Sequence, residues 1–320
     1  MITLLCDFYI QVRLTGGEPL LHPNLPSIIS SISSLPTIRS VGITTNGLTL
    51  SRQLPALLSS GLTHVNISLD TLHKDKFKEI TRRNGFDKVM KAIDEASMST
   101  IGIEVDTSSD KVETLNKHTS TGRVKVNCVV MKGFNDNELR DFVMLTKDKN
   151  VDVRFIEWMP FHENGWNQDR FVSYKDMLRL IQTDLEPNGN QNGSNTDEGQ
   201  NELGPIQMNR VNDGPNDTTK WYHVPGHKGR IGFITSMSEH FCSSCNRLRI
   251  TADGKLKVCL FGSKEVSLRD VMRTDDYTTK DLVRVINATV KKKTFALGGY
   301  DGAEGIAAAN TNRPMTLIGG

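Results

Sequence analysis

Residues 10–19 are IQVRLTGGEP, an apolar run that ends in a Gly-Gly turn. Paired glycines let a backbone approach a ligand closely, because no Cβ stands in the way. Similar runs lie at Val41–Thr44, His64–Leu69, Val124–Met131 and Val151–Ile156. They show little polar alternation, which is typical of parallel strands buried on both faces. The sequence therefore predicts five such strands, beginning with Ile10–Leu14.

Helical patterns lie between these runs. Apolar residues keep a 3.6-residue spacing from Leu25 to Leu35 and again from Phe86 to Ile93. Asn24, the pair Asn135 and Glu138, and the pair Ser173 and Asp176 are candidate caps. Strand, helix and strand at intervals of about 25–30 residues indicate right-handed βαβ units. Such units form a full or partial (β/α) barrel or an open sheet.

Two polar segments interrupt this rhythm. Residues 98–122 are rich in Ser and Thr where a short loop is expected. Residues 187–220 are rich in Asn, Gly, Asp and Pro, and we expect disorder there because little apolar surface is available to bury. The predicted domains are a barrel at 1–186, a linker at 187–220 and a C-terminal unit at 221–320.

Bulk composition excludes several classes of protein. The chain of 320 residues has a net charge of +2 and 37% hydrophobic residues. This balance gives no reason to expect a nucleic-acid partner. No apolar run approaches the roughly 18 residues that a membrane span requires. Five cysteines, three of them close together, favour a metal site in a reducing compartment over a disulfide framework.

The cysteine cluster lies near the C-terminus. Cys242 and Cys245 are followed by 13 residues and then Cys259. Three thiolates leave one ligand position open, as in an iron–sulfur cluster with a free iron, whereas His240 could complete a zinc site. Three buried cysteines without a metal are the third alternative. Arg247 and Arg249 alternate directly after Cys245, so on a strand they would share a face. Two guanidinium groups there suit a di- or triphosphate.

Polar motifs also follow the other predicted strands. They lie at Thr15–Leu20, Thr44–Gly47, Asn66–Asp70 and Glu157–Met159, and Lys125 lies on the fourth strand. Enzymes built from βα units bind ligands at the carboxyl ends of their strands. The sequence therefore predicts a ligand site at that end.

Together these motifs resemble the GTP 3′,8-cyclase family of radical S-adenosylmethionine enzymes. The matching stretches are Arg13–Leu20, Thr44–Gly47, Asn66–Leu72, Lys125–Gly133, Arg154–Met159, Ile234–Gly262 and the final Gly319-Gly320. The resemblance implies a partial (β/α) barrel with a C-terminal extension over its open side. It also implies two [4Fe-4S] clusters: one cleaves S-adenosylmethionine to a radical, and the other holds the guanine of GTP. The product, 3′,8-cyclo-GTP, opens molybdenum-cofactor biosynthesis and passes to a cyclic pyranopterin monophosphate synthase. Family members form homodimers, and eukaryotic ones are mitochondrial; a bacterial protein would be cytoplasmic.

Roles carried over from the resemblance fall on named residues. Cys242, Cys245 and Cys259 match the ligands of the second cluster. The matches to GTP contacts are Arg13, Thr44, Lys125, Arg247, Leu248 and Arg249. The matches to S-adenosylmethionine contacts are Gly17, Ser68 and Met159. Gly319 and Gly320 match a tail that supports catalysis.

One family motif is missing from the printed sequence. Radical S-adenosylmethionine enzymes carry C-x3-C-x2-C after the first barrel strand, and here Cys6 stands alone. Compared with the family pattern, we also expect the first βα unit to be absent from the printed residues. We therefore expect the N-terminal cluster to be absent and this chain, as printed, not to cyclise GTP. The alternatives are a GTP-binding pseudoenzyme or truncated isoform with a single iron–sulfur cluster, and a zinc-stabilised interaction domain.

Overall fold

The computed structural model describes residues 10–99, 124–183, 204–214, 216–294, 296–309 and 312–318. Cys6, most of the 98–122 segment, and Gly319 and Gly320 lie outside these residues. No helix among the residues described is both long and apolar enough to cross a membrane.

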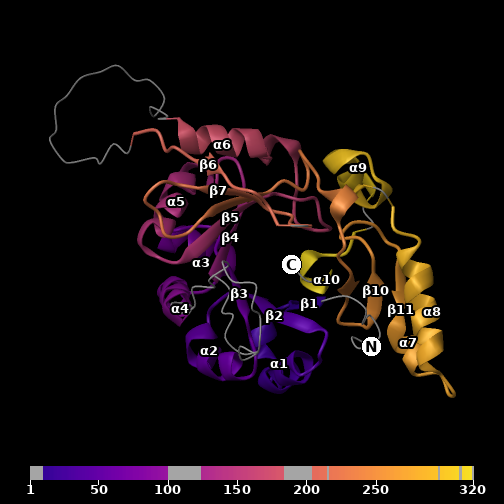
Figure 1. Cartoon of the computed structure of the whole chain (residues 1–320). Coiled ribbons are helices and arrows are strands. Elements are labelled where there is room, and N and C mark those ends of the chain that lie inside the picture. The colour runs from indigo at the N-terminus through magenta and orange to yellow at the C-terminus, as the bar shows by residue number, and fades with distance from the viewer. Residues whose placement is uncertain are drawn as a thin grey trace, which may run out of the picture.

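The main sheet confirms the predicted rhythm. Five parallel strands follow one another in chain order: β1 (Ile10–Leu14), β2 (Ile38–Thr45), β3 (His64–Ser68), β4 (Val124–Val130) and β5 (Val151–Glu157). The helices between and after them are α1 (Leu25–Ser33), α2 (Leu50–Ser59), α3 (Lys74–Thr81), α4 (Phe86–Ser99), α5 (Leu139–Asp148) and α6 (Tyr174–Gln182). Figure 1 shows helices along the outer side of this curved sheet and the C-terminal elements across its open side. The expected partial (β/α) barrel is therefore the observed fold.

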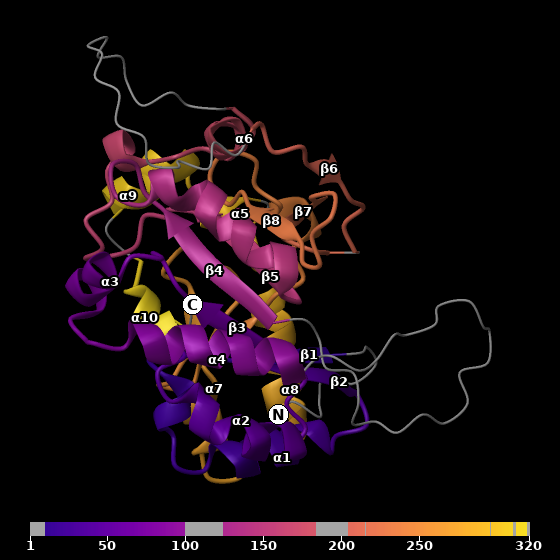
Figure 2. The same ribbon diagram turned by 90° about the vertical axis from the view of Figure 1, so that its left-hand side faces the viewer.

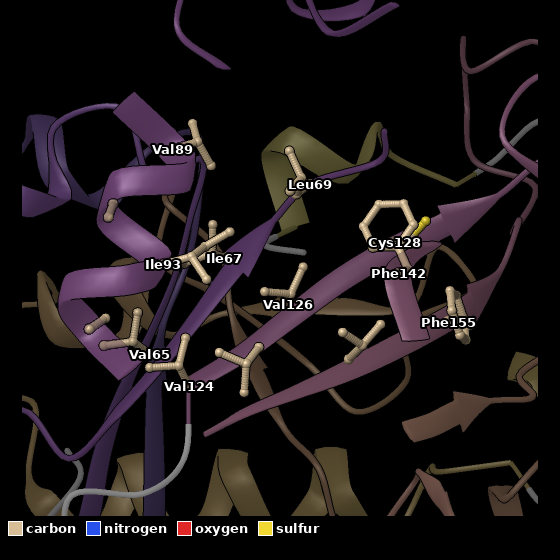
Figure 3. Packing of buried hydrophobic residues seen from close by; sticks show 14 of the residues in the cluster. Val65, Ile67, Leu69, Val89, Ile93, Val124, Val126, Cys128, Phe142 and Phe155 are labelled. Carbon is tan, nitrogen blue, oxygen red and sulfur yellow. The ribbon is translucent and has the colours of Figure 1, made fainter. Parts of the chain in front are cut away.

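The main hydrophobic core lies between the sheet and its helices. Val65 and Ile67 of β3 and Val126 of β4 face Ile93 of α4 (Figure 3), and all four are nearly inaccessible to solvent. Only one face of the strands is apolar. In β4, valines and Cys128 are buried alternately with the half-buried Lys125 and Asn127. The prediction of little polar alternation is thus wrong for β4, in which half-buried polar residues alternate with buried apolar ones.

The prediction of disorder is also wrong for part of the segment 187–220. The order of the sheet continues from β5 through β8 (Ile231–Ile234) to β7 (Lys220–His223) and β6 (Asn209–Arg210). Strands β6 and β7 draw on the segment expected to be disordered, and Thr218 and Thr219 just before β7 are buried. Pairing with β8 satisfies backbone groups that composition alone leaves out of account.

One of the three capping predictions is confirmed and two are wrong. Ser173 caps α6 by accepting a hydrogen bond from the backbone N–H of Asp176, whereas Asn24 makes no side-chain cap. The Asn135 and Glu138 pair is not a cap. Asn135 donates to the carbonyl of Asp70 (2.7 Å), and the buried Glu138 accepts from Thr71 Oγ1 (2.8 Å). These contacts join the loops after β3 and β4, a long-range role that local spacing does not reveal.

The C-terminal unit has a small core of its own. A three-stranded antiparallel sheet of β9 (Arg249–Ile250), β10 (Lys255–Lys257) and β11 (Glu265–Ser267) packs beside α7 (Leu268–Met272) and α8 (Thr279–Val290). Its buried residues are Leu256, Leu268, Leu282 and Ile286. The chain then forms α9 (Gly302–Ala309) and α10 (Met315–Ile318). Seen from the side, α10 lies near the ends of the barrel strands (Figure 2).

Candidate functional site

The inner face of the parallel sheet carries polar side chains at successive register positions. Thr44, Asn66 and Lys125 pair in register across β2, β3 and β4. Two residues further along, Asn127 pairs with Arg154 across β4 and β5. Residues in register on neighbouring strands point to the same face. The barrel interior therefore collects these groups, away from the apolar core.

Three cations of the barrel wall lie in this interior. Burial, followed by the charges of Arg154 and Arg13, lowers the pKa of Lys125 to about 8. Burial and the same kind of repulsion, first from Arg13 and then from Arg247, lower the pKa of Arg154 to about 9. Arg13 is reached by solvent, yet the surrounding protein and the charge of Arg247 lower its pKa as well. Burial is the largest cause of these shifts, and the smaller contribution of neighbouring cations shows that the positive charges lie close to one another.

Arg247 and Arg249 bring two more cations from the segment after Cys245. Arg247 donates a hydrogen bond from Nη2 to Thr218 Oγ1 (2.7 Å). Burial lowers the pKa of both arginines, and the charge of Arg247 lowers that of Arg249 further. Only Arg249 lies in a strand, β9, so the predicted shared strand is shorter than expected. We call Arg13, Lys125, Arg154, Arg247 and Arg249 the cation set.

Two carboxylates lie beside the cation set. Asp152 is buried and paired with Arg230 (2.7 Å), and its charge still raises the pKa of Lys125 and Arg154. Asp217 accepts from the backbone N–H of Thr219 (3.0 Å) and from Trp221 Nε1 (2.7 Å), and its charge raises the pKa of Lys125 and Arg154. Among the residues described, five cations against these two carboxylates, one of them shared with Arg230, make a site suited to a polyanion.

Sequence reasoning assigned no role to Arg154, Asp217 or Thr218. Arg154 opens one of the matched stretches, and its register with Asn127 on an alternating strand could have revealed it. Asp217 and Thr218 gave no signal, since they lie in the segment expected to be disordered. Leu248 behaves differently from its neighbours, because its side chain packs against the core of the C-terminal unit.

The residues predicted to contact S-adenosylmethionine lie at strand ends. No heavy atom would come within 4 Å of a Cβ built on Gly17, and Gly16 has φ +117, so the turn leaves open space. Glu18 joins this turn to the next strand end by accepting from Thr45 Oγ1 (2.6 Å) and Asn46 N (2.8 Å). Ser68, the last residue of β3, is exposed, whereas Met159 is buried. Their role stays a prediction.

The three clustered cysteines are free thiols, each half-buried. Burial raises the pKa of Cys242, with smaller contributions from Cys259 and Cys245. Burial opposes ionisation of Cys245 too, but the N–H of Arg247 and the ammonium of Lys293 lower its pKa overall. The backbone N–H of Leu297 donates to Cys242 Sγ (3.4 Å). These neighbours are of the kind that tune iron–sulfur clusters.

The side-chain positions do not confirm a metal site at the three cysteines. Among the residues described, no three His, Cys, Asp or Glu side chains are grouped to hold one metal ion. The iron–sulfur cluster and the zinc alternative with the exposed His240 therefore both stay predictions. Three free thiols with N–H and ammonium donors beside them fit, by their chemistry, a larger iron–sulfur group.

Comparisons with known proteins match both halves of the chain. Residues 6–108 match the model of the Radical SAM superfamily, and residues 200–297 match that of Molybdenum Cofactor Synthesis C. Molybdenum cofactor biosynthesis protein 1 of Dictyostelium discoideum is 46% identical over 97% of this chain, which spans 42% of that relative's length. The chain thus covers less than half of this relative.

Shorter relatives are covered more fully. The mitochondrial GTP 3′,8-cyclase of Arabidopsis thaliana is 42% identical, with 97% of this chain and 68% of the relative aligned. The GTP 3′,8-cyclase of Thermodesulfovibrio yellowstonii is 34% identical, with 97% of this chain and 81% of the relative aligned.

Proposed function

This chain belongs to the GTP 3′,8-cyclase family, and from that premise we propose that it binds GTP in the barrel interior. In this proposal the chain serves the cyclising step that opens molybdenum-cofactor biosynthesis. The cation set is the observation that carries the proposal. It offers five positive groups, one of them Arg154 with 6% of its surface exposed, to a ligand rich in phosphate.

The five cations would contact the phosphate groups of the ligand from two directions. Arg247 and Arg249 approach from the C-terminal unit, and Arg13, Lys125 and Arg154 approach from the sheet, so phosphate oxygens can be bound from two sides. Guanidinium groups bind such oxygens in pairs. Thr44, held by Asn66 Nδ2 (3.2 Å), is placed to orient the nucleotide.

The cysteines supply the second half of the proposal. Cys242, Cys245 and Cys259 would hold a [4Fe-4S] cluster whose open iron binds the purine. The open turn at Gly17, with Ser68 and Met159, would hold S-adenosylmethionine. The partners that follow are a cyclic pyranopterin monophosphate synthase and a second copy of the chain. A mitochondrial location follows from the plant relative alone.

Cysteine substitution tests this function directly. After anaerobic reconstitution, we expect a brown protein with about four irons for one [4Fe-4S] cluster, and calorimetric binding of GTP. Changing Cys242, Cys245 and Cys259 to Ser should remove the iron and weaken GTP binding. Cys128→Ser is the matched control, since Cys128 is buried on the helix-facing side of β4. Unchanged iron and GTP affinity in the triple variant would contradict the proposal.

A second candidate follows from the missing motif. The printed chain holds no C-x3-C-x2-C, so it can act as a GTP-binding protein with one cluster that does not itself cyclise GTP. The two candidates differ in product formation. With reductant and S-adenosylmethionine, the second candidate predicts that the printed chain releases no 5′-deoxyadenosine. If that product appears, the chain acts as a GTP-cyclising enzyme and the first candidate is favoured.

The pH dependence of GTP binding should report on Lys125. Its pKa is about 8 in the free protein, and a bound polyanion favours the charged ammonium. Binding above pH 8 therefore takes up a proton, so affinity should fall as pH rises through 8, by up to about tenfold per unit. Calorimetry from pH 7 to 9 measures this. Lys125→Arg should flatten the first part of the curve, because arginine stays charged and titration of the guanine is common to both proteins.

A further inference from the structure

A clamp of ion pairs holds the C-terminal segment. Arg313 Nη1 donates to both carboxylate oxygens of Asp253 (3.2 Å each), and Nη2 donates to Asp253 Oδ2 (3.1 Å). The same Nη2 lies 2.6 Å from Glu265 Oε2. One planar guanidinium therefore joins the turn before β10 to strand β11, an arrangement that a point charge cannot reproduce.

Neighbouring contacts tie the same segment down. Asn312 Oδ1 accepts from the backbone N–H of Gly262 (2.6 Å), in the loop after Cys259. Asn312 is buried, with 5% of its surface exposed. The chain is thus anchored at two consecutive residues, 312 and 313, immediately before α10.

The anchored segment leads directly to the candidate site. Ile318 at the end of α10 is 3% exposed and belongs to the same apolar cluster as Met159, Phe161 and Phe261. Cys242 and Cys259 pack against this cluster as well. Figure 1 shows α10 between the barrel strands and the β9–β11 sheet, so this short helix closes part of the open side.

We propose that Arg313 is a positioning residue that docks the C-terminal segment across the open side of the barrel, beside Met159 and the clustered cysteines. The inference does not rest on the proposed function, because it concerns only the docking of residues 312–318. Arg313 itself lies outside the cation set and is not a catalytic residue.

The docking contact is separable from the fold. Glu265 keeps Lys257 as a partner (3.3 Å) when Arg313 is removed, and Lys257 still donates to the carbonyl of Gly262. Asp253 keeps Lys255 at 3.4 Å. Loss of Arg313 therefore leaves no buried carboxylate without a partner, and we expect Arg313→Ala to fold with its tail released.

Trimming by a carboxypeptidase, followed by intact mass, tests the clamp on the full chain without any cofactor. We expect digestion of the wild-type protein to stall at the buried Ile318. Arg313→Ala should be trimmed past Ile318 roughly tenfold faster, since bidentate charge-assisted bonds are lost. Arg313→Lys should lie in between. Arg284→Ala is the matched control, because Arg284 is 79% exposed on α8 and pairs only locally with Asp281.

Salt and a second variant keep the test decisive if Arg313→Ala misfolds. In 1 M NaCl, screening of the ion pairs should speed trimming of the wild-type protein but not of Arg313→Ala. The variant also serves as a control, because any effect of salt on the protease itself would change both rates. Asp253→Asn should behave like a milder Arg313→Ala. If Arg313→Ala is trimmed at the wild-type rate, the inference is overturned. If Arg313→Ala misfolds, the inference is overturned when Asp253→Asn is trimmed at the wild-type rate and salt does not change the trimming of the wild-type protein. GTP binding is measured separately, so failure of the proposed function leaves a different signature.

Discussion

Replacing Arg247 and Arg249 together with alanine should weaken GTP binding by on the order of 100- to 10,000-fold. Each charge-assisted hydrogen bond contributes about 1.5–3 kcal/mol, and each 1.4 kcal/mol changes affinity tenfold. The surrounding protein partly buries both side chains. This burial lowers their pKa values and strengthens their attraction for an anion. Calorimetry at fixed salt measures the loss.

Matched variants separate charge from structure in that experiment. Thr218→Val removes the hydroxyl that accepts a hydrogen bond from Arg247 but leaves the charge of Arg247, so GTP affinity should change by less than about tenfold. Arg284→Ala should have no effect, since that arginine is exposed on α8. A double variant that binds GTP like the wild-type protein would show that the triphosphate does not meet these arginines.

Removing Glu157 should destabilise the protein more than any surface change. This carboxylate is fully buried at the end of β5 and accepts from the backbone N–H groups of Tyr174 (2.9 Å), Met237 (2.7 Å) and Ser238 (2.9 Å), and from the Ser238 hydroxyl. It joins β5 to the start of α6 and to the loop that leads to Cys242. Glu157→Ala leaves several buried donors without an acceptor, each costing about 1–3 kcal/mol.

We therefore expect Glu157→Ala to lose about 3 kcal/mol or more of unfolding free energy. For a domain of this size, that lowers Tm by roughly 6–12 °C. Thermal unfolding followed by circular dichroism measures it. Glu157→Gln should be intermediate, because its amide keeps one acceptor but turns a donor toward other donors. Glu79→Ala on the exposed side of α3 is the control. Equal Tm values for Glu157→Ala and Glu79→Ala would contradict this reading of the buried carboxylate.

The sequence predicted elements whose signals are local. The runs at β1 to β5 are short and rich in β-branched residues, and every one became a strand within a few residues of its predicted ends. The Ser173 cap was found because its partner lies three residues away. The same local reasoning failed for Asn135 and Glu138, whose side chains bond across the loops to Asp70 and Thr71 instead.

The residues of the candidate site fall into the same two groups: those that the local sequence predicts and those that only the fold brings together. Spacing alone singled out the three cysteines with Arg247 and Arg249, and the motif match added Arg13 and Lys125. Arg154, Asp217 and Thr218 joined them only through the fold. Register across β4 and β5 decides that Arg154 faces the interior, and pairing of β7 with β8 brings Asp217 there from a segment whose composition predicts disorder.

By itself, then, the sequence determined the βα rhythm, the family and the spacing of the three cysteines, since these depend on residues close together along the chain. The tertiary structure decided that five cations share one interior, that Leu248 turns away from it, and that Arg313 fastens the C-terminal segment across it. The physical reason is that the direction of a side chain depends on register and on contacts between distant segments, and neither is written in local periodicity.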